Sequence, residues 1–151
     1  MEKIYETAYA KINLGLDVLG KRSDGYHEVR MVMQSVGLSD AVEIEEGEGL
    51  VVETDHSGLA GGPDNLAWKA AELLARCCGK IPNVHIRLNK KIFLAAGLAG
   101  GSSDAAAVMR GLSRLWQLDL TAPELEKLAA ELGSDIPFCI TGGTALAEGR
   151  G

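Results

Sequence analysis

The sequence predicts an α+β fold in which helices pack on one face of a mixed sheet. Three observations lead to this fold class: strand-like alternation fills the first part of the chain, strand–loop–helix units follow it, and no repeats or low-complexity linkers interrupt them. The chain has 151 residues, of which 46% are hydrophobic, enough for one domain with a core of its own. We therefore expect a single domain over residues 1–151.

The first half of the chain carries most of the predicted strands. Residues 8–18 alternate in part between apolar and polar side chains, and a second strand-like run covers residues 29–38. Short strands are predicted at 42–44 and 50–54, and the glutamate- and glycine-rich segment between them is typical of a hairpin loop. Residues 84–88 show the clearest apolar–polar alternation in the chain.

The first two helices are predicted from their ends and their apolar spacing. Asp64 can cap a helix over residues 65–78, and Gly79 can end it in the left-handed conformation that glycine tolerates. Apolar residues within this stretch recur at helical spacing. A second helix, rich in alanine, is predicted from about Ser103 to Leu115, directly after a glycine-rich turn.

In the last third of the chain, the sequence predicts one further helix and one strand. Thr121 opens a capping box with a proline early in the helix, which indicates a helix over residues 125–132 that Gly133 ends. The segment Ser134–Pro137 is interpreted as a turn that leads to a final strand near residues 144–147.

Composition and charge exclude several classes of function. The net charge of −6, the pI of about 5.1 and the 5% of aromatic residues argue against a nucleic-acid partner. No run of eighteen apolar residues exists, so no membrane partner is expected. The three cysteines lack the spacing of a metal site or a disulfide framework, which favours a reducing compartment, the cytoplasm. No oligomeric state is indicated.

The segment Ala95–Ala107 is the most informative part of the chain for chemistry. It carries glycines at the end of a strand and leads into a helix that begins with Ser102 and Ser103. Glycine lets the backbone approach a ligand closely, and the first turn of a helix offers unpaired N–H groups that bind anions. The segment therefore predicts a phosphate-binding loop, in which the two hydroxyls could contact phosphate or Mg²⁺.

The same segment does not match two other nucleotide-binding motifs. A Walker loop requires a lysine after its glycines, and a dinucleotide fingerprint requires GxGxxG, whereas the segment reads GLAGG. A tight strand-to-helix turn that uses glycine only for packing remains an alternative. Asp104, just inside the helix, is interpreted as a partner of the helix dipole rather than as a catalyst.

Several motifs resemble those of one kinase superfamily. GLAGGSSDAA at 97–106 resembles the second motif of the galactokinase, homoserine kinase, mevalonate kinase and phosphomevalonate kinase superfamily. Residues 8–16, 24–27, 132–137 and 147–151 resemble its branch that phosphorylates a cytidine-diphosphate-linked methylerythritol in the non-mevalonate isoprenoid route. The resemblance implies a ribosomal protein S5 domain 2-like fold, ATP with Mg²⁺ as the phosphoryl donor, and a small-molecule substrate.

The resemblance also assigns roles to residues of this chain. Asp135 matches the catalytic base of the family, and Lys11 matches the lysine that pairs with that base. A carboxylate suits the role because the substrate hydroxyl must lose its proton as it attacks phosphorus. The residues matched to the cytidine end of the substrate are Asn13, Tyr26 and His27. The residues matched to the nucleotide are Asn65, Lys90, Phe93, Leu94, Ala95, Ala96, Gly97, Leu98, Ala99, Gly100, Gly101, Ser102 and Ser103. No metal ligand is assigned.

The sequence departs from the family at two points. Phe93 stands where the family usually has proline, and the chain stops at Gly151, where the family continues for nearly as long again. We therefore interpret residues 1–151 as an N-terminal ATP-binding kinase domain without its C-terminal half. Two alternatives are a catalytically silent nucleotide-binding fragment and a superfamily kinase for mevalonate-like or homoserine-like alcohols. The motif Asp24–His27 argues against the second, since a small alcohol offers no base for it to contact.

Overall fold

The computed structural model describes residues 3–21, 23, 27–56, 61–92, 100–142 and 144–150. In this part of the chain the strands are β1 (Lys3–Lys21), β2 (His27–Glu46), β3 (Val51–Thr54), β4 (Val84–Asn89) and β5 (Thr144–Arg150). The helices are α1 (Leu66–Cys78), α2 (Gly100–Leu115), α3 (Ala122–Ala129) and α4 (Ile136–Thr141).

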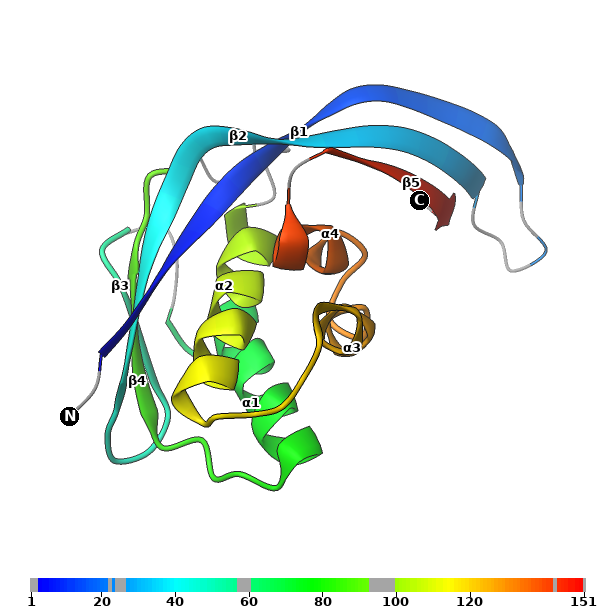
Figure 1. Ribbon diagram of the computed structural model, residues 1–151. Helices are drawn as coiled ribbons and strands as arrows, with labels where there is room; N and C mark the ends of the chain where they lie inside the picture. The colour runs from blue at the N-terminus through cyan, green and yellow to red at the C-terminus, as the bar shows by residue number, and fades with distance from the viewer. Residues whose placement is uncertain are drawn as a thin grey trace.

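The strands form one mixed sheet that is organised around β2. The order is β1-β2-β4-β3, and β5 also pairs with β2 (Figure 1). The two long strands β1 and β2 form a curved antiparallel ribbon. On its other edge β2 pairs with β4 through residues 41–46 and with β5 through residues 28–34. Neither β4 nor β5 is paired with residues 35–40 of β2, so these residues form the central segment of β2 that lies between the two pairings.

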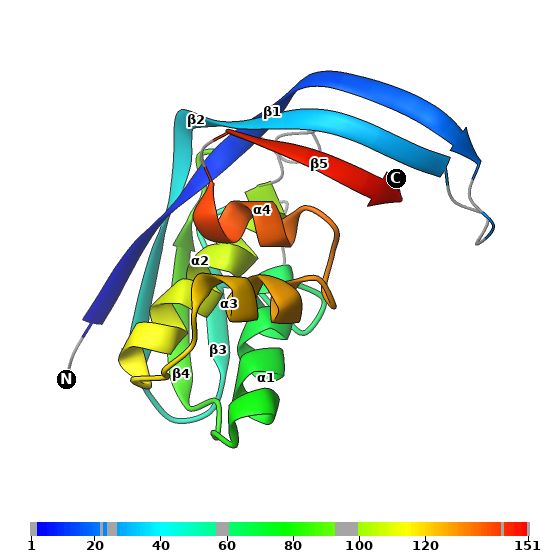
Figure 2. The ribbon, with the colours of Figure 1, turned by 45° about the vertical axis from the view of Figure 1, so that its right-hand side comes forward.

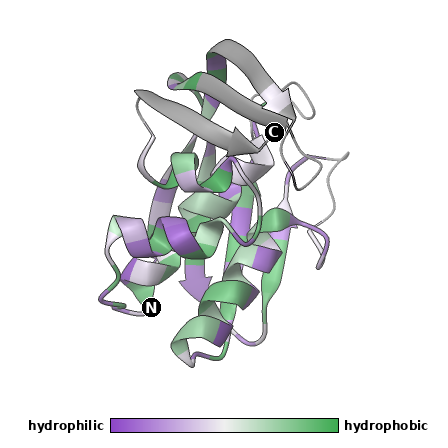
Figure 3. Cartoon of the chain, turned by 90° about the vertical axis from the view of Figure 1, so that its right-hand side faces the viewer, coloured by the Kyte–Doolittle hydropathy of each residue, from purple (hydrophilic) through white to green (hydrophobic). Residues whose placement is uncertain are grey.

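The helices gather on the concave face of the sheet, as predicted. Figures 1 and 2 show all four described helices on the same side, where α1 packs against α2, and α4 packs against both α2 and α3. Apolar residues of the sheet and of α1 and α2 form the core, and the helices alternate apolar with polar positions (Figure 3). Among the described residues, no helix is long and apolar enough to span a membrane.

The predicted hairpin between residues 42–44 and 50–54 is wrong. Residues 42–44 belong to β2, and β3 lies parallel to β4 rather than beside β2. The strand β4 separates them because Val84, Ile86 and Leu88 supply an apolar face that is almost fully buried. The segment β3–α1–β4 is thus a crossover between parallel strands, and α1 covers the sheet between them.

Local signals located most helix ends to within a few residues. Asn65, not Asp64, caps α1 by accepting a hydrogen bond from the Ala67 amide, and Gly79 ends the helix with φ +65°, as predicted. The capping box at Thr121 is confirmed, but α3 begins earlier than predicted and ends at Ala129. The turn predicted at Ser134–Pro137 is instead the start of the short helix α4.

An irregularity in β1 changes which of its side chains face the helices. The pairing register with β2 shifts between Tyr9 and Lys11. Before the shift, even-numbered residues such as Ala8 face inward, whereas after it Lys11 is buried and Ile12 is exposed. An inserted residue has this effect because successive side chains in a strand point to opposite faces. The apolar residues Ile12 and Leu14 therefore lie on the outer face, contrary to the half-buried strand expected.

Candidate active site

Lys11 and Asp135 come together beside the central segment of β2, where Lys11 pairs with Ser35. The distance between Lys11 Nζ and Asp135 Oδ2 is 3.8 Å, and Lys11 Nζ donates a hydrogen bond of 3.2 Å to Asn13 Oδ1. The lysine side chain is 6% exposed and the aspartate side chain 39% exposed. The cation is thus almost enclosed, whereas the carboxylate still reaches solvent, where a substrate hydroxyl could approach it.

The start of α4 explains why Asp135 is available for chemistry. Asp135 is the N-cap residue of α4, a position where aspartate usually accepts a hydrogen bond from the helix. Its side chain makes no such bond here. The next residue, Ile136, is fully buried, and Pro137 fits the first turn because that turn needs no N–H donor there. The helix end is therefore held by packing, while the carboxylate pairs with Lys11.

The first turn of α2 lies on the same face of the sheet. Gly101 is exposed and Ser102 is half-buried, whereas Ser103 is 2% exposed. The Ser103 hydroxyl donates a hydrogen bond of 2.6 Å to the Tyr9 carbonyl of β1, two residues before Lys11. Ser103 therefore joins α2 to the irregular part of β1, which leaves Ser102 as the more accessible of the two hydroxyls.

Lys90 lies between two buried aspartates. Its ammonium pairs with Asp40 at 2.5 Å and with Asp104, and its side chain is 0% exposed. The second oxygen of Asp40 accepts hydrogen bonds from the backbone amides of Lys91 at 2.6 Å and Ile92 at 2.9 Å. We call Asp40, Lys90 and Asp104 the buried triad. It ties together β2, the residues that follow β4, and the first turn of α2.

The triad contains one cation and two carboxyl groups, and their protonation differs. The pKa of Asp104 is raised from 3.8 to about 8, mainly by burial and secondly by the hydrogen bond to Asp40. Burial opposes ionisation of Asp40 too, but hydrogen bonds from Asp104, Ile92 and Lys90 hold its pKa below the ordinary value. Of the two carboxyl groups, Asp40 is thus the one that more readily carries the negative charge facing Lys90, and Asp104 is the one that more readily holds a proton.

The raised pKa of Asp104 gives a testable pH dependence. Because folding raises this pKa, the folded state binds the proton more tightly than the unfolded state between pH 3.8 and about 8. The contribution of Asp104 to the free energy of unfolding must therefore fall as the pH rises through that window. We expect Asp104→Asn to remove this fall, so that the stability of the variant rises relative to that of the unmodified protein as the pH increases. Urea unfolding of both proteins at several pH values measures the two free energies of unfolding. Parallel plots of these free energies against pH would contradict the prediction.

The other predicted nucleotide and substrate residues are only partly described. Asn65 is buried, and its side chain caps α1. The backbone of His27 begins β2, opposite Lys21. Tyr26 and the loop residues Phe93–Ala99 lie outside the described residues. Lys90 uses its ammonium within the protein, so its contact with adenine and ribose, like the roles of the others, stays a prediction.

Two of the site's supporting residues were not predicted from the sequence. The sequence does not indicate that Asp40 is buried, because aspartate is almost never fully buried unless it is paired and its partner Lys90 lies 50 residues away. Asp104 was interpreted as a partner of the helix dipole, yet it is 1% exposed and pairs with Lys90. The three alanines that follow it could have indicated that this side of α2 is buried.

One pocket lies away from the charged pair. It has a volume of about 640 Å³ between α2, α3 and the end of α4, and neither Lys11 nor Asp135 lines it. Among the described residues, no group of three or more His, Cys, Asp or Glu side chains is placed to hold a metal ion. The candidate site is therefore identified by the pair of charged groups, Lys11 and Asp135, and not by this pocket.

Part of the chain matches a known protein family. Residues 65–143, from the cap of α1 to the end of α4, match the N-terminal domain of the GHMP kinases. The chain belongs to the GHMP kinase family. The matched region contains the buried Lys90 and Asp104, the first turn of α2 and Asp135, while Lys11 comes from the strand before it.

Curated GHMP kinases resemble the chain over nearly its whole length. The 4-diphosphocytidyl-2-C-methyl-D-erythritol kinase of Caldanaerobacter subterraneus is 50% identical over 149 residues, which cover 99% of this chain and 52% of that protein. The enzyme of the same name from Bacillus pumilus is 54% identical over 151 residues, again 99% of this chain and 52% of that protein. The chain thus spans about half the length of the curated relatives it matches.

Solved structures of GHMP kinases confirm the predicted ribosomal protein S5 domain 2-like fold. A crystal structure of 4-(cytidine 5'-diphospho)-2C-methyl-D-erythritol kinase matches with a TM-score of 0.82 and 39% identity, covering 97% of this chain and 52% of that chain. The mevalonate kinase of Methanococcus jannaschii matches with a TM-score of 0.73 at 15% identity, which shows the common fold. It covers 97% of this chain and 54% of that one.

Proposed function

We propose that the protein containing this chain transfers the terminal phosphoryl group of ATP to a hydroxyl of 4-diphosphocytidyl-2-C-methyl-D-erythritol. The observation that carries the proposal is the approach of Lys11 and Asp135 to 3.8 Å, from segments far apart in the sequence. Relatives at 50% to 54% identity that bear the name of this kinase support the choice of substrate. A cytoplasmic location, expected from the sequence, belongs to the same proposal.

The two residues divide the chemistry between them. Asp135 accepts the proton of the substrate hydroxyl as its oxygen attacks the terminal phosphorus of ATP. Lys11, held by Asn13 and almost enclosed, keeps the carboxylate oriented and stabilises negative charge that develops on the transferred group. Low exposure strengthens this attraction, because water screens a buried charge less than a surface charge.

The start of α2 is the proposed site for the nucleotide phosphates. A helix of sixteen residues presents N–H groups and a positive dipole end at its first turn, and Gly101 leaves that turn open to solvent. Ser102 adds a partly exposed hydroxyl. Mg²⁺ bound with ATP would neutralise charge on its phosphates.

The substrate's cytidine end is assigned to the outer part of the β1–β2 ribbon. Asn13 links this region to the catalytic pair through its hydrogen bond to Lys11. We propose that Tyr26 stacks on the base and that His27 hydrogen-bonds to it. The presence of the motif Asp24–His27 in the sequence supports the cytidine-linked substrate over a small alcohol, which has no base to contact.

A coupled assay of ADP release tests the proposed function. The full-length protein should turn over ATP with 4-diphosphocytidyl-2-C-methyl-D-erythritol, and with neither mevalonate nor homoserine. Turnover with either alcohol would contradict the substrate assignment. Nucleotide binding without any turnover would instead support the reading as a silent nucleotide-binding module.

Gly101 offers a clean test of the phosphate site. A Cβ atom on Gly101 would meet Leu66 at 3.5 Å, an ordinary contact, whereas one on Gly100 would approach Ile92 to 3.0 Å. We therefore expect Gly101→Leu to fold normally and to block the phosphates, so that ATP binding weakens about tenfold or more. Calorimetry with ATP and with the cytidine-linked substrate separates the two sites. An equal loss of both affinities would assign the effect to misfolding and contradict the prediction.

A further inference from the structure

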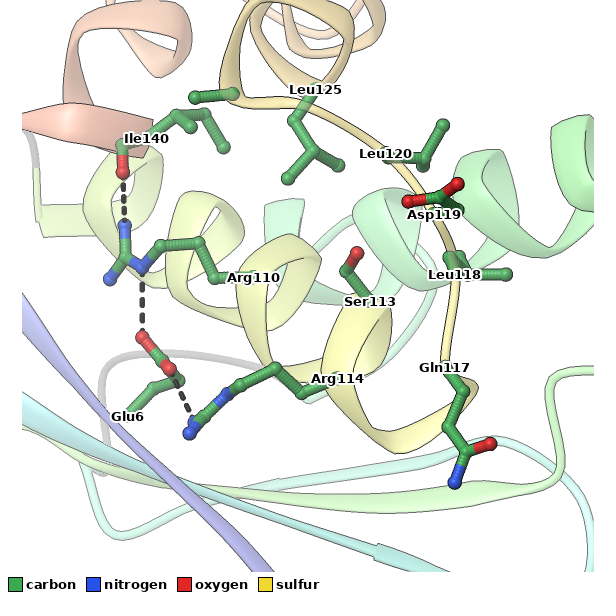
Figure 4. A pocket seen from close by; sticks show the side chains of 11 residues that line it. Glu6, Arg110, Ser113, Arg114, Gln117, Leu118, Asp119, Leu120, Leu125 and Ile140 are labelled. Carbon is green, nitrogen blue, oxygen red and sulfur yellow. Dashed lines mark hydrogen bonds and ion pairs between the residues drawn. The ribbon is translucent and has the colours of Figure 1, made fainter.

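The side chain of Arg110 joins three elements. It extends from α2, and its Nε donates to Glu6 Oε1 of β1 at 2.8 Å (Figure 4). Its Nη1 donates to the carbonyls of Cys139 at 2.7 Å and Ile140 at 3.1 Å, at the end of α4. Its Nη2 donates to the Thr7 carbonyl of β1 at 3.0 Å. One guanidinium therefore holds the end of α4 against β1.

The same two elements meet again at the other end of α4. Asp135, which precedes the helix, pairs with Lys11 of β1. The helix has only six residues, too few to be stable without contacts to the rest of the protein. Since the Lys11–Asp135 distance of 3.8 Å exceeds that of a hydrogen bond, this pair alone fixes the helix weakly.

We propose that Arg110 is a positioning residue that sets the place of Asp135 relative to Lys11 and thereby the rate of phosphoryl transfer. The proposal rests on the proposed function. Arg110 contacts neither residue of the pair in the described structure, and it acts through the carbonyl groups at the end of α4. A displacement of about 1 Å at a reacting group can lower a rate roughly 10²-fold. Loss of the guanidinium therefore lowers kcat, while the first turn of α2 continues to bind ATP.

Arg114 provides a matched control on the same helix. It lies one turn further along α2, pairs with the other oxygen of Glu6 and donates to the Tyr5 carbonyl of β1. Within the described residues no hydrogen bond or ion pair joins it to α4, and Figure 4 shows it on the far side of Glu6 from Ile140. Replacing Arg114 removes the same charge and a contact to the same carboxylate, but leaves the hydrogen bonds between Arg110 and α4 in place.

The test compares Arg110→Met with Arg114→Met in the full-length protein. Methionine keeps much of the aliphatic stem and removes every hydrogen-bond donor. We expect Arg110→Met to lower kcat about 10- to 100-fold with KM for ATP nearly unchanged, and Arg114→Met to change kcat less than about threefold. Equal losses in the two variants, or a loss confined to KM, would overturn the proposal.

A double-mutant cycle shows whether Arg110 acts through Asp135. In the background of Asp135→Asn, the further change Arg110→Met should lower the residual rate little, because the base whose position it sets is already absent. If Arg110→Met lowered the rate by the same factor in the Asp135→Asn background as in the unmodified protein, the proposal would be overturned.

Amide hydrogen exchange separates this proposal from the proposed function. The Cys139 and Gly142 amides bond to carbonyls within α4, at Asp135 and Phe138. Both should exchange faster in Arg110→Met than in Arg114→Met, a result that needs no enzymatic turnover. Unchanged exchange in Arg110→Met would overturn the positioning role. An inactive unmodified protein would refute the proposed kinase activity while leaving this comparison interpretable.

Discussion

Replacing Asp135 by asparagine should lower kcat by roughly 10²–10⁴-fold in the full-length protein, while ATP binding stays within about twofold. Asparagine keeps the shape of the side chain and its place at the start of α4, but it cannot accept the proton of a substrate hydroxyl. The nucleotide is proposed to bind at the first turn of α2, which Asp135 does not contact in the described structure. Single-turnover kinetics with saturating ATP measures the chemical step directly.

Glu131 supplies the control for this substitution. It is an exposed carboxylate between α3 and α4, near Asp135 in sequence but without a contact to Lys11 among the described residues. Glu131→Gln removes the same charge and should leave kcat unchanged. A near-normal rate in Asp135→Asn, or an equal loss in the control, would exclude Asp135 as the base.

Replacing Lys90 by methionine should lower the free energy of unfolding by about 3–5 kcal/mol, the usual cost of removing one partner of a buried ion pair. The substitution leaves Asp40 ionised and without its cation, and the Asp40 side chain is 0% exposed. The loss should shrink at low pH, because protonation of Asp40 then removes the unpaired charge. Urea unfolding measures both effects.

Lys69→Met is the matched control for Lys90→Met. Lys69 is exposed on α1, so the same loss of charge and gain of apolar surface should change the stability by less than about 1 kcal/mol. Comparable losses in the two variants would contradict a buried triad. A loss that stays constant with pH would show that the unpaired carboxylate is not its cause.

Helix ends were predictable because they depend on neighbouring residues. The left-handed Gly79 and the capping box at Thr121 follow from local backbone chemistry, and both are present. The choice between Asp64 and Asn65 as the cap of α1 was wrong by one residue, since both side chains suit the position and only the tertiary structure selects one. The helix α4 was missed because Ser134–Pro137 fits a turn equally well.

The candidate site depends on features that sequence periodicity does not reveal. The register shift before Lys11 turns that side chain inward, and no residue type at this point in β1 signals the shift. The pairing with Asp135 was implied by family resemblance, whereas the spacing of the two residues could not indicate it. The burial of Lys90 was equally unpredictable, because its two partners come from β2 and α2.

The pairing of β5 with β2 also has a consequence for the order in which the chain folds. Thr144 pairs with Gln34 and Arg150 with Glu28, so this part of the sheet joins segments from the two ends of the sequence. Closing so long a loop costs more conformational entropy than forming the β1–β2 ribbon, whose strands follow each other directly. During synthesis Lys11 leaves the ribosome long before Asp135, and the ribbon can form while α4 is still absent. Within residues 1–151, the pair proposed to carry the chemistry is therefore among the later contacts to form. A chain whose synthesis stopped before Asp135 would contain Lys11 without the proposed base.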